Sequence, residues 1–247
     1  TIMLVPFMSC GAKLTIYALF AGAFFKANKG LVIFSMYILG FLVAIAVGLL
    51  LKKTIFKGNM ALFVMELPPY RMPMPKSVLK NTWDKCKGFL VKAGTVIFSM
   101  SIVIWLLQNF SPSFHMVDDS SQSIFGIIGA AIAPIFAPLG FGTWQASVSL
   151  LSGLVAKEAV VSSLGVLYGA GGDSLSAVIS SVFTPLSAYS YMVFCLLYVP
   201  CVSAFATIKR EMGSLKWALV SAAMQIGVAY LVSLLIYQAG SLMGRIF

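Results

Sequence analysis

Two of the four cysteines in this sequence follow Val-Pro pairs and have the chemistry of metal ligands. Cys201 comes directly after Val199-Pro200. Cys10 follows Val5-Pro6 after three further residues. A thiolate is a soft ligand that suits a transition metal better than a sugar or an alkali ion, and Met8 could add a thioether sulfur. The alternative is that each cysteine is a small buried hydrophobic residue, the usual role of a lone cysteine in a membrane segment.

The proline before Cys201 interrupts an apolar run, residues 188–208, that is long enough to cross a bilayer. Pro200 has no backbone N–H and clashes with the preceding turn, so a helix must kink or break there. The carbonyl of Leu196 then loses its helical partner, which is tolerated in a membrane only where the group faces protein or a water-filled cavity. Two broken segments, each delivering a cysteine, predict a binding site near the membrane midplane between two halves of a transporter.

Three ionisable residues lie inside apolar segments and are candidates for a role in transport or gating. Lys157 and Glu158 fall in the run 144–169, and Lys13 falls in the first apolar run. Charged groups are costly inside a membrane and are functional candidates for that reason. Adjacent helical residues do not face each other, so Lys157 and Glu158 each need their own partner. Lys13 is a plausible partner for Glu158. These residues could act in the permeation path, and the alternative is a buried pair that only fixes two helices.

Other polar residues are weaker candidates. Ser9 and Ser203, close in sequence to the two cysteines, are assigned to transport or gating together with the lysines. His115 lies in a polar loop beside Asp118 and Asp119. This loop could collect cations outside the membrane, although solvated loop residues are the commoner explanation.

No arrangement typical of an enzyme is found. The sequence has no HExxH pattern, no Ser/His/Asp arrangement and no GxxxxGK[ST] phosphate loop. We therefore expect no catalytic residue and no nucleotide site in this chain. No aromatic–basic surface for the recognition of bases is visible in the sequence, so nucleic acid is not an expected partner.

The composition is that of an integral membrane protein. Of 247 residues, 60% are hydrophobic and 10% are charged, whereas about 25% are charged in a soluble domain. The net charge is +10, and nine of the basic residues lie within residues 52–92. This concentration predicts a cytoplasmic loop that contacts anionic lipid. The chain begins at Thr1 without a signal-peptide pattern, so we expect a fragment of a longer protein.

The apolar runs predict an all-α, polytopic helical membrane bundle with broken helices, about seven spans and a surface amphipathic helix. The amphipathic helix is predicted from Leu79, Trp83, Cys86 and Leu90, which recur at helical spacing after a proline-rich stretch, residues 66–75, that should be extended. The predicted spans are residues 2–25, 31–51, 93–110, 124–139, 144–169, 188–208 and 217–239.

Several longer motifs resemble one family. They are Val5 to Leu14, Tyr17 to Phe20, Val64 to Tyr70, Trp144 to Ala146, Ala156 to Val161, and Tyr198 to Cys201. In this order they cover nearly the whole chain, which resembles the membrane domain of bacterial ferrous iron transport protein B (FeoB). One departure is Thr15, where many members have proline. The gate segments are also similar to those of concentrative nucleoside transporters, as an analogy of fold.

The resemblance implies that the chain is the carboxyl-terminal half of such a membrane domain. Residues 1–51 would hold the end of the first gate segment and the following span, and 52–92 the cytoplasmic loop. Residues 93–139 would form core spans, and 140–247 the second gate segment and the terminal spans. The GTPase domain and the first membrane helices would be partners outside this chain. Small Feo accessory proteins and further copies of the chain are other implied partners.

The same resemblance implies movement of Fe²⁺ into the cytoplasm across a bacterial inner membrane, along a path lined by the residues matching Cys10 and Cys201. Fe²⁺ is then the transported substrate. Broken-helix carbonyls would supply further ligands, and Lys157 and Glu158 would tune charge or gating. Two alternatives belong to other classes: a transporter of organic solutes of the nucleoside type, and a membrane scaffold that transports nothing.

Overall fold

A computed structural model describes residues 2–54, 72, 74–111, 115–116, 120–171 and 173–246, and these fold into helices and short connections. The only extended pairing within these ranges is an isolated bridge between Phe110 and Met116. The predicted all-α class is therefore confirmed. In chain order the helices are η1 (Ile2–Phe7), α1 (Gly11–Phe24), α2 (Lys29–Thr54), α3 (Pro75–Asn109), η2 (Ser120–Gln122), α4 (Ile124–Phe136), η3 (Ala137–Leu139), α5 (Trp144–Val155), α6 (Ala159–Leu167), α7 (Asp173–Val182), α8 (Pro185–Leu197), α9 (Val202–Met212) and α10 (Leu215–Ile246).

Four helical segments of the described chain are long and apolar enough to cross a membrane: Ile2–Phe24, Lys29–Thr54, Pro185–Met212 and Leu215–Leu242. A fifth is added if Ile124–Leu139 and Trp144–Val155, which meet at an angle of 102°, are counted as one broken span. The chain is thus a multi-pass membrane protein, and the predicted number of seven spans is not confirmed. The first and third of these segments are interrupted near Pro6 and Pro200, as the prolines predict.

Two predicted elements differ from the observed ones. The amphipathic helix and the span predicted at 93–110 form one continuous helix, α3, because no proline interrupts the chain between Pro75 and Asn109. The segment predicted as one span over 144–169 is instead divided into α5 and α6. Ala156 is extended at this break, with φ −145° and ψ 131°. The proline-rich stretch before α3 lies almost entirely outside the described residues.

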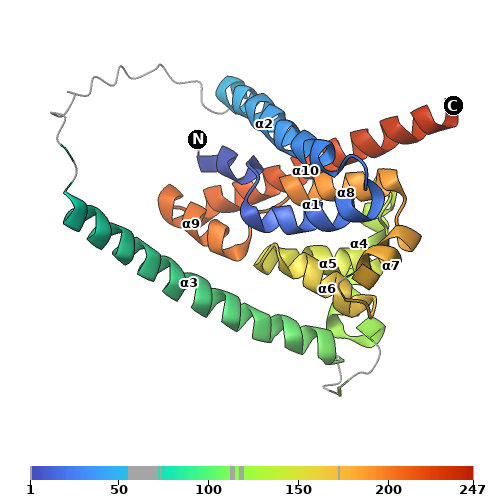
Figure 1. Cartoon of the computed structure of the whole chain (residues 1–247), viewed down its shortest axis with the longest axis horizontal. Helices are drawn as coiled ribbons and strands as arrows, with labels where there is room; N and C mark the ends of the chain where they lie inside the picture. The colour runs from blue at the N-terminus through green and yellow to red at the C-terminus, as the bar shows by residue number, and fades with distance from the viewer. Residues whose placement is uncertain are drawn as a thin grey trace.

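The core is built around α8, which packs against α10, α1 and α2 (Figure 1). Nearly every side chain of α8 is buried, polar ones included. Its Tyr191 ring meets Phe20 of α1, Phe141 of the α4–α5 bend and Phe183 of the α7–α8 turn, with ring centroids 5.1 to 5.7 Å apart. The neighbours of α8 come from both ends of the chain. The first proline-broken segment, η1 and α1, therefore lies beside the second, to which α8 itself belongs.

Serine hydroxyls join α8 to its neighbours within this apolar core. Ser190 and Ser233 of α10 place their Oγ atoms 2.8 Å apart, and the Ser233 hydroxyl donates to the Ser190 carbonyl at 2.8 Å. Ser149 of α5 pairs with the Tyr191 hydroxyl at 2.7 Å. These groups satisfy one another where water is excluded, which fixes the register of the helices.

The bend between α4 and α5 depends on a glycine. Gly140 ends η3 in the left-handed region, with φ 87°, where L side chains are strained. A β-carbon at Gly140 would also overlap the ring of Tyr237 on α10. The bend therefore turns the chain through a sharp angle while keeping it in contact with α10.

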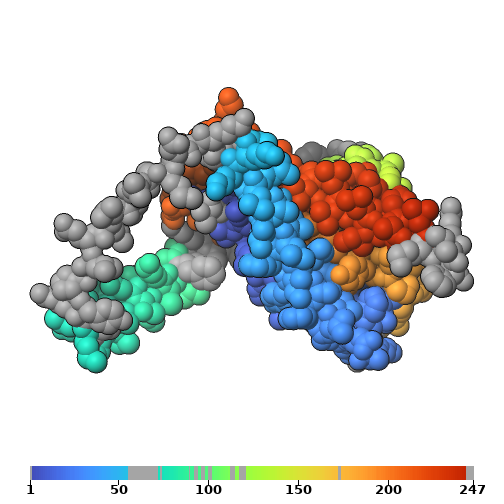
Figure 2. Space-filling view, turned by 90° about the horizontal axis from the view of Figure 1, so that it is seen from above, coloured from blue at the N-terminus to red at the C-terminus, as the bar shows by residue number. Residues whose placement is uncertain are grey.

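The long helix α3 runs along one side of the molecule, and its amino-terminal half stands apart from the body formed by α1, α2 and α10 (Figure 2). It contacts α4, α5 and α9. Leu79, Trp83, Cys86 and Leu90 are all exposed. The described residues therefore do not cover the apolar stripe that predicted a membrane-surface helix, and its position at a membrane surface stays a prediction.

Candidate functional site

A cavity of about 460 Å³ lies between the two proline breaks and is lined by both cysteines. Cys10 is the N-cap residue of α1, and Cys201 is the N-cap residue of α9. The two thiols thus occupy equivalent positions, each where a helix resumes after a break. Segments 191 positions apart in sequence contribute them to one cavity, together with Pro6, Met8 and Pro200. Both thiols therefore face a shared space, and the use of this space as a paired-thiol metal site stays a prediction.

Lys13 joins the two broken segments through their backbone. Its side chain is 4% exposed. The ammonium donates hydrogen bonds to the carbonyl oxygens of Pro6 at 2.9 Å, Met8 at 3.1 Å and Leu196 at 2.8 Å. The Leu196 carbonyl is the group that Pro200 deprives of its helical partner, so this lysine satisfies it in place of the missing N–H.

Lys157 makes a related contact from the break between α5 and α6. It is 3% exposed, and its Nζ donates to the carbonyl of Val199 at 2.8 Å. The same Nζ lies 3.2 Å from the centroid of the Tyr198 ring, a cation–π contact. Lys157, at the break between α5 and α6, thus places its ammonium against the backbone at the break before Pro200.

Tyr198 is held in place for this contact. Its ring stacks on Phe194 with centroids 5.5 Å apart, and its hydroxyl donates to the Leu150 carbonyl of α5 at 3.3 Å. Gly153, one turn further along α5, leaves room for the hydroxyl, because a β-carbon there would overlap it. The absence of a side chain at Gly153 therefore lets α5 approach Tyr198 and the break at Pro200.

Glu158 does not pair with Lys13, so that predicted pairing is wrong. The carboxylate is exposed and lines a separate cleft of about 340 Å³ between α3 and α6, with Gln108, Ser162 and Ser163. The chain turns at the α5–α6 break so that Lys157 and Glu158 point into different cavities. As predicted, the two adjacent residues form no ion pair with each other.

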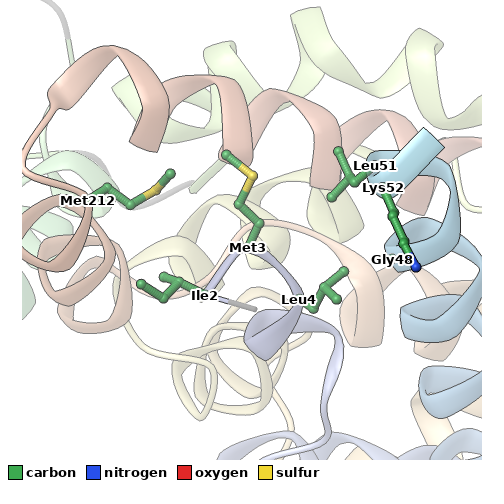
Figure 3. A pocket seen from close by; sticks show the side chains of 7 residues that line it. All are labelled: Ile2, Met3, Leu4, Gly48, Leu51, Lys52 and Met212. Carbon is green, nitrogen blue, oxygen red and sulfur yellow. The ribbon is translucent and has the colours of Figure 1, made fainter. Parts of the chain in front are cut away.

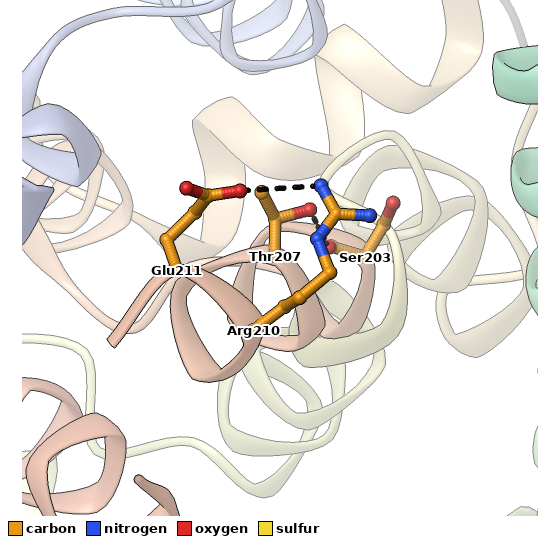
Figure 4. A network of polar contacts seen from close by, with 4 residues as sticks. All are labelled: Ser203, Thr207, Arg210 and Glu211. Atoms are coloured by element: carbon orange, nitrogen blue, oxygen red, sulfur yellow. Dashed lines mark hydrogen bonds and ion pairs between the residues drawn. The ribbon is translucent and has the colours of Figure 1, made fainter. Parts of the chain in front are cut away.

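The remaining predicted residues lie around the thiol cavity. Met8 lines it and is 51% exposed. The Ser9 hydroxyl is buried near that of Tyr17, and neither makes a well-formed hydrogen bond to the described residues. Ser203 is half-buried on the first turn of α9, and its carbonyl accepts a hydrogen bond from Thr207 at 3.1 Å (Figure 4).

Glu211 is a residue that the sequence reasoning missed. Its carboxylate lines the thiol cavity from α9 and lies 3.4 Å from Arg210, in an exposed ion pair (Figure 4). The sequence alone assigned no role to Glu211, which lies in a charged stretch after Lys209 and Arg210. Four-residue spacing from Thr207, which also lines the cavity, could have placed Glu211 on the same helix face.

The other cysteines and the loop histidine lie away from this cavity. Cys195 is fully buried in α8, and Cys86 is exposed on α3. His115 is exposed, while Asp118 and Asp119 lie outside the described residues. Among those residues, no three His, Cys, Asp or Glu side chains cluster as metal ligands would. A cation in the thiol cavity would therefore combine sulfur with other ligands, such as the Glu211 carboxylate that also lines this space.

A second cavity, of about 480 Å³, has a different character (Figure 3). Side chains of η1, α2 and α9 line it, and all but Lys52 are apolar or glycine. The figure shows the apolar side chains of Ile2, Met3 and Leu4 around this space. Its lining side chains offer no ligand for a metal ion beyond thioether sulfur and the Lys52 amine.

Comparison with known proteins gives two family matches. Residues 33–85 match the carboxyl-terminal region of ferrous iron transport protein B, and residues 90–215 match the gate family described as nucleoside recognition. No solved structure matches the chain.

Named relatives agree with the first match. The chain is 47% identical over 243 residues to an Fe(2+) transporter FeoB of Staphylococcus aureus and 43% identical over 250 residues to that of Methanocaldococcus jannaschii. A Porphyromonas gingivalis protein, in which an Fe(2+) transport protein A is fused to FeoB, is 38% identical over 290 residues. Each alignment covers 98% of this chain and 34% to 37% of the relative, so the chain spans about a third of their length. The chain therefore belongs to the family of ferrous iron transport protein B and corresponds to the carboxyl-terminal membrane part that contains its gate region.

Proposed function

We propose that this chain forms the permeation part of a transporter that moves Fe²⁺ into the cytoplasm. The observation that carries the proposal is the pair Cys10 and Cys201, which two distant, proline-broken segments bring to one cavity. Thiolates would replace part of the water shell of the ion, and carbonyl oxygens at the breaks would complete it. The names of the relatives, which are Fe(2+) transporters, support this substrate.

The energy source and the partners would lie outside this chain. A GTPase domain and further membrane helices would supply coupling, as the family resemblance implies. The fusion of an Fe(2+) transport protein A to the Porphyromonas gingivalis relative supports a small Feo protein as a partner. The protein would reside in the inner membrane, in contact with anionic lipid and with other copies of itself.

Anaerobic uptake by the intact transporter in proteoliposomes tests the proposal. Fe²⁺ should accumulate inside the vesicles in a nucleotide-dependent manner, with Mn²⁺, Co²⁺ and Zn²⁺ offered as competitors because first-row ions compete for sulfur and oxygen sites. Vesicles that accumulate none of these ions would refute the function.

The second candidate is a transporter of nucleosides or related organic solutes. The match of residues 90–215 to the gate family described as nucleoside recognition favours it. Such a transporter would accumulate a labelled nucleoside and would retain this activity when both cavity thiols are replaced. A scaffold would show neither uptake nor stabilisation by metal ions.

Topology provides a direct prediction for α3. Lys76 is exposed on its first turn. In intact cells, a cysteine at Lys76 in a Cys86→Ser background should react with membrane-impermeant maleimide only after the cytoplasm is opened, because the basic region 52–92 should be cytoplasmic. A cysteine at Ser121, within η2, is the opposite-side control. Labelling of position 76 in sealed cells would show that the orientation is opposite to the predicted one.

Glu158 provides a test of the cleft beside α3. Because the carboxylate is exposed, Glu158→Gln should leave the unfolding temperature unchanged. It should lower Fe²⁺ uptake roughly tenfold at low salt, where a negative charge at a cleft concentrates cations. Asp84→Asn, an exposed acid on α3, is the matched control. Normal uptake combined with a lower unfolding temperature would assign Glu158 a structural role.

A further inference from the structure

The carbonyl oxygens around Lys13 have the arrangement of a cation site. An ammonium carries three N–H donors, and all three are matched, by oxygens at 2.9, 3.1 and 2.8 Å. No carboxylate takes part, and the described part of the chain holds no ion pair to Lys13. Shells of backbone carbonyls bind cations that have lost their water, as in the selectivity filters of channels.

This cage is assembled from both proline-broken segments. Pro6 and Met8 supply two oxygens from the stretch before α1, and Leu196 supplies the third from the last turn of α8. Lys13 itself lines the thiol cavity, so its flexible side chain lies between the cage and the space that Cys10 and Cys201 share. Withdrawal of the ammonium would leave three carbonyl oxygens facing that space.

We propose that these three carbonyl oxygens form a cation-binding site that the Lys13 ammonium fills as a tethered cation, and that a free cation takes when the ammonium withdraws. The chemical class is a small cation that accepts oxygen ligands, such as ammonium or a dehydrated metal ion. The site is distinct from the thiols because its ligands are hard oxygen atoms and its present occupant is part of the chain.

The position of the site gives Lys13 control over the cavity, and this step rests on the proposed function. Lys157 and Glu211 line the same cavity as Lys13, so an ion held by the thiols would face two lysine side chains and one carboxylate. Like charges repel strongly in a site with little water. A cation in the cavity and the Lys13 ammonium therefore compete for the three carbonyl oxygens, and the cation reaches them only when the ammonium leaves the cage.

Chemical rescue of Lys13→Ala tests the cage without reference to iron. In the intact transporter, this variant should unfold roughly 5 °C or more below the wild type, because buried carbonyls lose their donors. Ammonium or methylammonium chloride should restore part of this loss in a saturable manner, while tetramethylammonium chloride, which has no N–H, should not. The wild type and Lys26→Ala, an exposed lysine after α1, should show no such dependence. Equal responses of all three proteins to ammonium would overturn the proposal.

A second arm covers failure of the variant to fold. If Lys13→Ala yields no folded protein, purification in methylammonium chloride should recover it. Lys13→Gln, which keeps a shorter donor, should be folded and only weakly responsive. Failure to recover Lys13→Ala, with Lys13→Gln equally indifferent to all three salts, would also overturn the site.

Transport separates this inference from the proposed function. Lys13→Ala should raise nucleotide-independent Fe²⁺ uptake at least about fivefold, since the tethered competitor is gone. Rescue by ammonium without Fe²⁺ uptake by the wild type would retain the cage and refute iron as substrate. Fe²⁺ uptake by the wild type without ammonium rescue would retain the substrate and refute the cage.

Discussion

Serine in place of Cys10 or Cys201 is expected to lower Fe²⁺ uptake by at least about tenfold, equivalent to about 1.4 kcal/mol of lost ligand interaction. Both thiols line one cavity at equivalent N-cap positions, and a hydroxyl is a poor substitute for a soft sulfur ligand. If the two thiols act as one unit, the double variant should be little worse than either single variant. Anaerobic uptake of radioactive iron by proteoliposomes measures all three.

The remaining cysteines serve as controls of two kinds. Cys86 is exposed on α3, so Cys86→Ser should leave both uptake and stability unchanged. Cys195 is fully buried in α8. A serine there would bury a hydroxyl, so Cys195→Ala is the better variant, expected to lower stability and spare transport. A double Cys10→Ser, Cys201→Ser variant that carries iron at the normal rate would disprove the paired-thiol site.

Gly153→Val is expected to destabilise the protein by about 1–3 kcal/mol, as overpacking of a filled core does, and to abolish transport. A side chain at Gly153 would overlap the Tyr198 hydroxyl and Val160 of α6. The Lys157 ammonium lies over the Tyr198 ring. Displacement of this ring would therefore disturb the break between α5 and α6 together with the break at Pro200. Thermal unfolding and iron uptake of the purified variant measure the two effects.

Gly227 in α10 is the matched control, because no atom lies within 4 Å of a β-carbon built there. Gly227→Val should therefore have little effect on stability or uptake. Tyr198→Phe removes the overlapping hydroxyl and should relieve part of the loss caused by Gly153→Ala, a coupling that a double-mutant cycle measures. Equal stability of Gly153→Val and Gly227→Val would show that the close approach of α5 to the second break is unimportant.

The breaks at Pro6 and Pro200 could be predicted because their cause is local. A proline removes a donor wherever it stands, and the freed carbonyl of Leu196 follows from counting four residues back. The break between α5 and α6 has no such local signal, since the residues 156–158 include neither proline nor glycine. What accompanies this break is a tertiary contact, the hydrogen bond from the Lys157 ammonium to the Val199 carbonyl.

The partners of the buried charges could be predicted only in part. From the sequence, Lys13 was expected to pair with the Glu158 carboxylate, whereas in the structure its ammonium donates to three carbonyl oxygens. The information was present, because Pro200 frees an acceptor that a buried ammonium can satisfy. The sequence does not contain the distances between segments. For the same reason, the position of Glu158 in a separate cleft could not be predicted.

The reciprocal hydroxyl pair between Ser190 and Ser233 has a mechanical consequence. Sliding or rotating α8 against α10 would separate several hydrogen bonds at once and leave hydroxyls unpaired in the core. These two helices therefore behave as a fixed frame of reference. Because contacts with Leu150 and Lys157 hold Tyr198 and Val199, torsional freedom is left to the joint at Pro200. Cys201 lies on the far side of that joint and the Leu196 carbonyl on the near side. A small rotation of α9 can thus change the separation of the two sulfurs while one wall of the carbonyl cage stays still.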